Sequence, residues 1–225
     1  MAEPLPLFPL GHTVLFPGVV LPLHVFEERY RELVRTLVEL PEGARRRFGV
    51  VAIRQGWEVG EDAASALHDV GCAADLRRVS RYPDGRYDIV TVGTDRFRLR
   101  EVDRSSRPYL VGSVEWLPPE PPSDAAGLAS AVGTLFGEYA DAAAGLQARP
   151  AETPELPTDP TELSYVVAAG AVLTLEDRQS LLAADTTRGR LRAELRLLKR
   201  ETTMVRRLRA LPVPIAELQV TQSLS

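Results

Sequence analysis

The chain has few residues that could form cross-links or bind a metal. Its 225 residues contain one cysteine, Cys72, so a disulfide within the chain is impossible. The three histidines, His12, His24 and His68, show none of the Cys or His spacings typical of a zinc site. We therefore expect no metal and no cofactor. A single cysteine is also consistent with a reducing compartment.

Long apolar runs are missing as well. The first residues lack the basic segment and the continuous apolar stretch of a signal peptide. No run approaches the roughly 18 apolar residues that a membrane span requires. We therefore expect a cytoplasmic protein that does not enter a membrane. Lysine is nearly absent, since Lys199 is the only one among 27 basic residues, and this bias towards arginine is typical of a GC-rich bacterial genome.

The motifs of common catalytic machinery are absent too. The phosphate-binding loop G-x-x-x-x-G-K-[ST] needs a lysine, but Lys199 follows two leucines in an amphipathic segment. The hydrolase motif G-x-S-x-G is missing. A Ser–Lys pair could use only Lys199, which lies among arginines and not in a desolvated site. His68 and Cys72 would lie roughly 13 Å apart on one strand, too far for a Cys–His pair. We predict no catalytic residue and no enzymatic activity.

The net charge of −4 conceals a local asymmetry. The segment from Arg188 to Arg209 contains nine basic and two acidic residues, a balance of +7, which leaves −11 for the remainder. The simpler interpretation is a solvated helix face that is attracted to the acidic remainder of the chain. An acidic external partner is the alternative.

The first half of the sequence is typical of β-structure. Apolar or alternating runs predict strands at 5–10, 19–23, 48–54, 67–79, 87–92, 97–102 and 109–117. The turn sequence Tyr82-Pro83-Asp84-Gly85 predicts a hairpin between two of them. One helix interrupts the strands and ends before Pro41 and Gly43. Its predicted apolar stripe consists of Phe26, Tyr30, Leu33, Val34 and Leu37.

The composition changes at the proline-rich residues 118–122, after which helical patterns follow. Asp159 can cap a helix that begins at Pro160, and further helices are predicted from Leu175 and from Asp185 or Thr186. These patterns predict an α+β fold. We assign a β-rich lobe with one inserted helix to 1–117, a connector to 118–122, an α-helical lobe to 123–210 and a flexible tail to 211–225.

Three groups of motifs resemble a known family in the order in which they occur. The first group is LPLFPL at 5–10, VLFPG at 14–18 and LPLHVFE at 21–27, followed by ERYREL at 28–33. The second is VGCAA at 70–74, PDG at 83–85, VG at 92–93 and RFRL at 96–99. The third is QSLL at 179–182 and TRGRL at 187–191. Together they resemble the substrate-binding domain of the Lon proteases, with Cys72 in place of the family's usual threonine.

The resemblance implies a PUA-like fold for the β-rich lobe and a role in gripping substrate proteins. The catalytic serine and lysine of the family lie outside this domain, so no catalytic residue can be assigned here. We therefore expect a stand-alone, non-catalytic module that binds exposed apolar protein segments, with a separate ATPase or protease as a possible partner. Nucleic acid is an unexpected partner.

Two alternatives stay open at this stage. PUA-like folds can bind RNA, so an RNA- or nucleotide-binding module is the first, although the β-rich lobe shows little excess positive charge. A hydrolase with an unrecognised site is the second. For the binding surface we predict exposed rings, because aromatic groups contribute strongly to interface energy. The predicted substrate-binding residues are Phe16, Trp57, Tyr82 and Trp116; the alternative is that these rings only cover the edges of the lobes.

Overall fold

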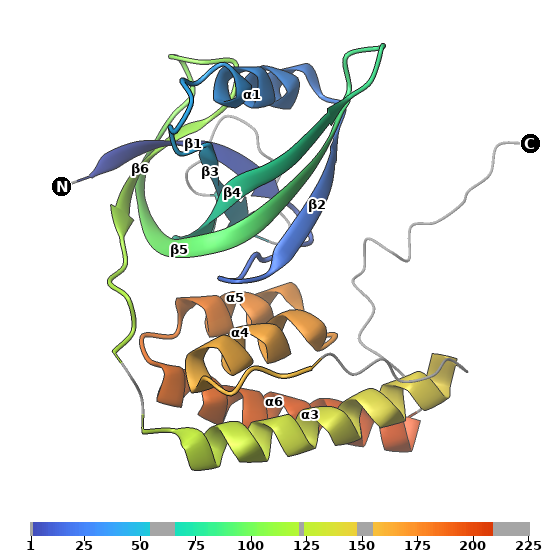
Figure 1. Ribbon diagram of the computed structural model, residues 1–225. Coiled ribbons are helices and arrows are strands. Elements are labelled where there is room, and N and C mark those ends of the chain that lie inside the picture. The colour runs from blue at the N-terminus through green and yellow to red at the C-terminus, as the bar shows by residue number, and fades with distance from the viewer. Residues whose placement is uncertain (1, 55–65, 122–123, 148–154, 209–225) are drawn as a thin grey trace, which may run out of the picture. The chain divides into compact units, whose positions relative to one another are not determined.

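A computed structural model describes residues 2–54, 66–121, 124–147 and 155–208 (Figure 1). These residues form six strands and five helices, so the fold is α+β. The chain divides into two compact units, Met1–Pro119 and Glu120–Ser225. All six strands and helix α1 lie in the first unit, and the other helices lie in the second. Within the described ranges, no helix is both long and apolar enough to cross a membrane.

The sheet of the first unit closes on itself. Its strands are β1 (Glu3–Leu10), β2 (Val20–Val25), β3 (Arg47–Ala52), β4 (Val70–Arg81), β5 (Tyr87–Asp103) and β6 (Val111–Trp116). The hydrogen-bonded order is β2-β5-β4-β3-β1-β6, and β6 also pairs with β5. Closure depends on the length of β5, whose first half pairs with β2 while its last residues pair with β6. Strand β2 pairs only with β5 and is therefore an edge strand.

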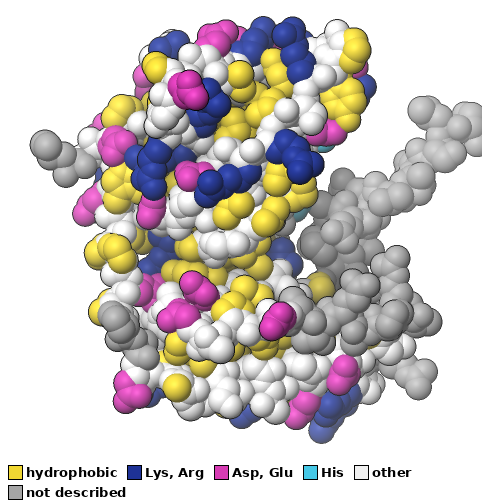
Figure 2. Space-filling model, viewed as in Figure 1, with side chains coloured by type: hydrophobic (Ala, Val, Ile, Leu, Met, Phe, Trp, Pro, Cys, Tyr) yellow, Lys and Arg dark blue, Asp and Glu magenta, His cyan; other side chains and the backbone are white. Residues whose placement is uncertain are grey.

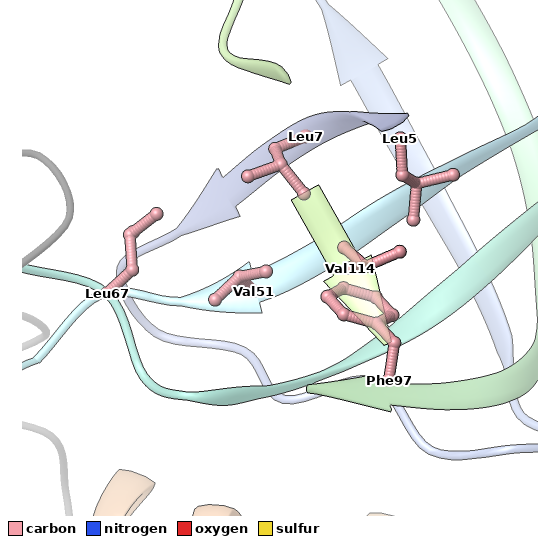
Figure 3. Close-up of a cluster of buried hydrophobic side chains, with 6 residues drawn as sticks. All are labelled: Leu5, Leu7, Val51, Leu67, Phe97 and Val114. Atoms are coloured by element: carbon pink, nitrogen blue, oxygen red, sulfur yellow. The ribbon is translucent and has the colours of Figure 1, made fainter. Parts of the chain in front are cut away.

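The core of this unit lies inside the closed sheet. Figure 3 shows six buried side chains that point towards one another from four strands and from the segment before β4: Leu5, Leu7, Val51, Leu67, Phe97 and Val114. Two glycines make room for the Phe97 ring. A Cβ atom added at Gly71 would lie 2.4 Å from the ring, and one at Gly49 would lie 2.7 Å from it. The VGCAA motif at 70–74 and the RFRL motif at 96–99 therefore belong to one packing arrangement.

The predicted hairpin is confirmed. The N–H of Tyr82 donates to the carbonyl of Arg86, and Gly85 takes the positive φ of 86° that favours glycine. The predicted strands at 87–92 and 97–102 are one continuous strand, because both segments extend the same β5 ladder with β4.

Helix α1 (Glu28–Val38) buries one side against the sheet unit. Four residues of the predicted stripe, Tyr30, Leu33, Val34 and Leu37, are buried. The fifth, Phe26, was wrongly placed in this stripe: Glu27 is the extended N-cap residue of α1, so Phe26 precedes the helix and 62% of its surface is exposed.

The second unit contains α3 (Ala126–Gln147), α4 (Pro160–Gly170), α5 (Leu175–Ala183) and α6 (Thr187–Leu208). As predicted, Asp159 caps α4 by accepting hydrogen bonds from the N–H groups of Thr161 and Glu162. Thr174 caps α5 in a similar way, because its side-chain hydroxyl accepts a hydrogen bond from the N–H of Asp177. The predicted tail at 211–225 lies outside the described residues.

A buried ion pair links α6 to the residue that opens this unit. The guanidinium of Arg190 lies 2.9 Å from the carboxylate of Glu120, and both side chains are almost fully buried. Arg190 also donates to the hydroxyl of Ser164 and stacks over the ring of Tyr165. Burial alone would raise the pKa of Glu120, but hydrogen bonds from Arg190 and Thr187 hold that pKa below its ordinary value. Thr187 and Arg190 of the TRGRL motif therefore have a structural role, because they belong to this buried network of hydrogen bonds.

Candidate functional site

A cleft of about 320 Å³ opens on the sheet unit between the end of β1, the end of β2 and the start of α1. The sequence brings these segments together because β2 leads directly into α1 through Phe26 and Glu27. The cleft is lined by Phe8, Pro9, Leu10, Gly11, Leu23, His24, Val25, Phe26, Glu27, Arg29, Tyr30 and Ile53. Most of these residues are apolar, so the cleft suits an apolar group.

Aromatic rings form part of the wall and rim of the cleft. Phe8 and Tyr30 are buried and stack with their ring centroids 4.1 Å apart and an interplanar angle of 17°. Phe26 is the most exposed large hydrophobic residue in the described part of the chain. Because Phe26 also lines the cleft, a ligand in the cleft would contact an exposed ring as well as buried ones.

The charged residues at the cleft neutralise each other. The guanidinium of Arg29 lies 2.6 Å from the carboxylate of Glu27, and it also lies over the Tyr30 ring, 4.8 Å from the centroid. In Figure 2, basic and acidic side chains are interspersed with hydrophobic ones on the visible face of the sheet unit. The cleft therefore presents no excess of one charge to a ligand.

A polar cluster adjoins the cleft through His24. The Nδ1 atom of His24 lies 2.7 Å from the carboxylate of Asp88, and the Tyr82 hydroxyl donates to the same carboxylate over 2.5 Å. The hydrogen bond from Tyr82, followed by that from His24, holds the pKa of Asp88 below its ordinary value. The pairing of β2 with β5 places His24 opposite Asp88, although 64 residues separate them in sequence.

The structure places the predicted site residues in different surroundings. Tyr82 is 39% exposed at the hairpin, and its ring centroid lies 6.1 Å from that of His24. It therefore adjoins the cleft. Trp116 is half-buried: its indole N–H donates to Glu3, and its ring packs edge-on against Phe97. Trp57 lies outside the described residues.

The expected exposure of Phe16 is wrong, because this residue is fully buried. Its loop is attached to β5 through reciprocal backbone hydrogen bonds, in which Gly18 donates to Gly93 and Gly93 donates to Val19. A Cβ atom at Gly93 would lie 2.1 Å from the Phe16 carbonyl oxygen, so glycine is required for this close approach. Phe16 is consequently a packing residue.

The groups tested for catalysis on the sequence are placed unfavourably for it. Cys72 is fully buried, and burial raises the pKa of its thiol far above the ordinary value, which suppresses the reactive thiolate. Lys199 is exposed on α6 and is not desolvated. No group of three or more His, Cys, Asp or Glu side chains in the described ranges could hold a metal ion.

The most distinctive residues of this surface, Phe26, His24 and Asp88, could not be recognised from the sequence. The spacing of Phe26 matches the helical period of α1, so the sequence pattern places it in the helix. In the structure it lies before the helix and is exposed. His24 and Asp88 meet only through the strand register, and nothing in their local sequence indicates this contact. The apolar LPLHVF segment did contain the signal, since Leu23 to Phe26 all line the cleft.

Comparison with known proteins agrees with the sequence motifs. The family model described as "ATP-dependent protease La (LON) substrate-binding domain" matches residues 4–200. A Lon protease from Anaeromyxobacter dehalogenans is 29% identical over 205 residues, which are 90% of this chain and 24% of the relative. A Lon protease from Porphyromonas gingivalis is 35% identical over 118 residues, which are 52% of this chain and 13% of the relative. The chain thus spans a quarter or less of these two relatives.

Solved structures show the same fold. A Lon N-terminal domain protein from Xanthomonas campestris matches with a TM-score of 0.62 and 26% identity, covering 86% of this chain and 98% of that one. The N-terminal domain of the Lon protease of the Mycobacterium avium complex matches with a TM-score of 0.59 at 18% identity, covering 88% of this chain and 98% of that one, which supports the fold alone. The chain belongs to the family of Lon substrate-binding domains.

Proposed function

We propose that this chain is a non-catalytic module that binds exposed apolar segments of other proteins. Phe26 is the observation that carries the proposal, because this aromatic side chain is 62% exposed at the rim of an apolar cleft. An exposed apolar group gains free energy when a partner removes it from water. Unfolded proteins expose apolar side chains and therefore supply suitable partners.

The surroundings of Phe26 support the binding of apolar segments that differ in sequence and charge. The Glu27–Arg29 pair neutralises the charge at the cleft, so a segment would be selected for its apolar content more than for its charge. Tyr82 extends the aromatic surface beyond His24. Of the three predicted substrate-binding residues that the structure describes, Phe16, Tyr82 and Trp116, only Tyr82 lies beside this surface, and its role remains a proposal.

The finer features of the proposal rest on the family. They are a PUA-like sheet unit, a cytoplasmic location, and action without ATPase or peptidase chemistry of its own, either alone or together with a separate ATPase or protease. The buried Cys72 and the exposed Lys199 are consistent with a lack of catalysis. A labelled unfolded protein should therefore bind and stay intact during incubation, with and without ATP.

The variant Phe26→Ala tests the proposed surface. Because its ring is exposed, its removal should weaken binding of a chemically unfolded, fluorescently labelled protein by about 1–2 kcal/mol, roughly a 5- to 30-fold rise in Kd. Fluorescence anisotropy measures this change. The melting temperature should stay nearly constant, because an exposed side chain contributes little to the core.

The matched control is Val38→Ala, which removes another exposed apolar side chain of the same unit that does not line the cleft. This variant should bind like the unaltered protein. Equal binding by all three proteins would reject the cleft as the binding surface. Stronger binding of RNA than of unfolded protein would reject the proposed class of ligand.

A further inference from the structure

Apart from Arg188, whose guanidinium donates to the backbone carbonyl of Asp124, the basic residues of α6 fall into two groups. Three of them pair with acidic residues of the same unit. Arg190 contacts Glu120 in the interior, Arg200 lies 2.7 Å from Asp177, and Arg206 lies 3.7 Å from Glu138. The positive charges of these three arginines are therefore paired with acidic residues of the chain itself.

The second group has no such partners. Arg192, Arg196, Lys199 and Arg207 are exposed, and none of them makes an ion pair in the described part of the chain. With 100° between successive residues, these four positions fall within about 80° of the helix circumference and extend over about 22 Å. We call them the basic stripe. The opposite face of α6 carries the buried residues Leu191, Leu198 and Val205.

Three of the four residues of the basic stripe repel one another within the helix. Arg192, Arg196 and Lys199 follow one another at spacings of four and three residues, where like charges repel by a few tenths of a kcal/mol, about 0.2–0.5 per pair. Acidic groups from outside would remove this repulsion. The stripe is therefore a surface that complements negative charge.

We propose that the basic stripe is a docking surface for an acidic segment of a partner protein. Carboxylates repeated every three or four residues along a helix would match its spacing. This surface is separate from the cleft, so the inference does not depend on the function proposed above.

Two observations favour an acidic protein segment over a nucleic acid. Single-stranded nucleic acids bind by stacking on aromatic rings, but Met204 is the only exposed large hydrophobic residue among the described residues of the helical unit. In addition, the remainder of the chain carries −11 and would repel a long polyanion. A short acidic segment can pair with the stripe and avoid this repulsion.

The test uses the full chain and a fluorescein-labelled, glutamate-rich peptide, followed by fluorescence anisotropy. The triple variant R192E/R196E/K199E should weaken binding about ten-fold or more, since each exposed ion pair contributes up to about 1 kcal/mol. Binding should also weaken as salt rises, because exposed charges are screened. The three side chains make no ion pairs with the residues that the structure describes, so the variant should melt like the unaltered protein.

The matched control is R77E/R78E/R81E, which changes the net charge equally on exposed positions of β4. It should bind the acidic peptide within about two-fold of the unaltered protein, because the stripe is intact. Equal losses in both triple variants would show a general charge effect and overturn the proposal. Tighter binding of a single-stranded oligonucleotide than of the acidic peptide would overturn it as well, as would an absence of peptide binding.

Discussion

At the scale of single residues, the closed sheet depends on glycines at positions where a larger residue would clash. Gly71 lies on β4 beneath the Phe97 ring, and an added Cβ atom would lie 2.4 Å from this ring and 2.7 Å from the Val50 carbonyl oxygen. The carbonyl belongs to the ladder and cannot move without disturbing β3. The contact is therefore a steric requirement for glycine.

We predict that Gly71→Ala destabilises the protein by about 1–3 kcal/mol, the usual cost of overpacking a core. Gly137→Ala is the control, because an added Cβ atom there meets nothing within 4 Å and the residue lies in helix α3. That change should leave stability unchanged or raise it by up to about 1 kcal/mol. Urea unfolding measures both, and a harmless Gly71→Ala would show that Phe97 adjusts freely.

A second residue links stability to pH. Glu194 on α6 is 1% exposed, and neither of its carboxyl oxygens has a hydrogen-bond partner in the part of the chain that the structure describes. Burial raises the pKa of Glu194 to about 8, although the nearby charge of Arg190 opposes the rise. The folded protein therefore keeps a proton on Glu194 at a pH where the unfolded chain has lost it.

The sign of the pH effect follows from proton binding. Between the ordinary pKa of 4.5 and about 8, the folded state holds one proton more than the unfolded state at Glu194. The free energy of unfolding should consequently fall as pH rises, by at most about 1.4 kcal/mol per pH unit. The contribution is fully present below pH 4.5 and is lost as pH passes 8.

Glu194→Gln should remove this dependence, because an amide does not titrate. Relative to the unaltered protein, the variant should become progressively more stable between about pH 5 and pH 8, and the difference should level off above that range. Urea unfolding of both proteins at several pH values measures it. Parallel stability curves would mean that Glu194 is ionised in the folded state.

At the scale of secondary-structure elements, the Glu120–Arg190 pair joins α6 to the start of the helical unit. Both groups are desolvated. Arg190 also donates to Ser164, and Tyr165 and Thr187 donate to Glu120, while Nη1 of Arg190 has no hydrogen-bond partner among the described residues. A buried ion pair contributes little compared with an apolar pair, but a single remaining charge is costly. The elements are thus held together by the pairing of two buried charges.

Removing one partner should expose that cost. Arg190→Met leaves Glu120 buried without its cation, and we expect a loss of about 3–5 kcal/mol in the free energy of unfolding. Arg206→Met on the same helix removes an exposed arginine 3.7 Å from Glu138 and should cost less than about 1 kcal/mol. Similar losses for both variants would contradict a special role for the buried pair. Adding Glu120→Gln to Arg190→Met should recover part of the stability.

Much of the element pattern could be predicted from the sequence, for identifiable reasons. Alternating apolar residues revealed the strands, and Pro83-Asp84-Gly85 revealed the hairpin because its residues suit only a turn. The break predicted within β5 was wrong, since Gly93 resembles a turn residue but serves the close approach of the Phe16 loop. Local patterns do not report such contacts across the sheet.

The candidate site was less predictable for the same reason. Phe16 has the proline and glycine neighbours of a surface loop, yet hydrogen bonds between its loop and Gly93 fix it as a buried residue. Phe26 has the spacing of a buried helix residue, yet the helix begins two positions later. Tyr82 was singled out from its place at the hairpin tip, and the structure shows it exposed there. Whether it binds a protein segment is a prediction.

At the scale of the whole molecule, the chain combines two surfaces of different chemistry. The sheet unit has an apolar cleft with neutralised charges, and the helical unit has a basic stripe on α6. Membership of the Lon substrate-binding domain family agrees with a role in protein recognition. The two surfaces lie in different units, so each can be altered separately to assign the binding of unfolded proteins.

The most direct measurement is amide hydrogen exchange of the full chain, free and with an excess of a chemically unfolded protein. Binding at the cleft should slow exchange in the end of β1, in β2 and in the first turn of α1, because these segments carry the lining residues. Exchange in α6 should be unaffected by an unfolded protein without acidic segments. Unchanged exchange around Phe26, with either no protection or protection confined to the helical unit, would contradict the proposed function.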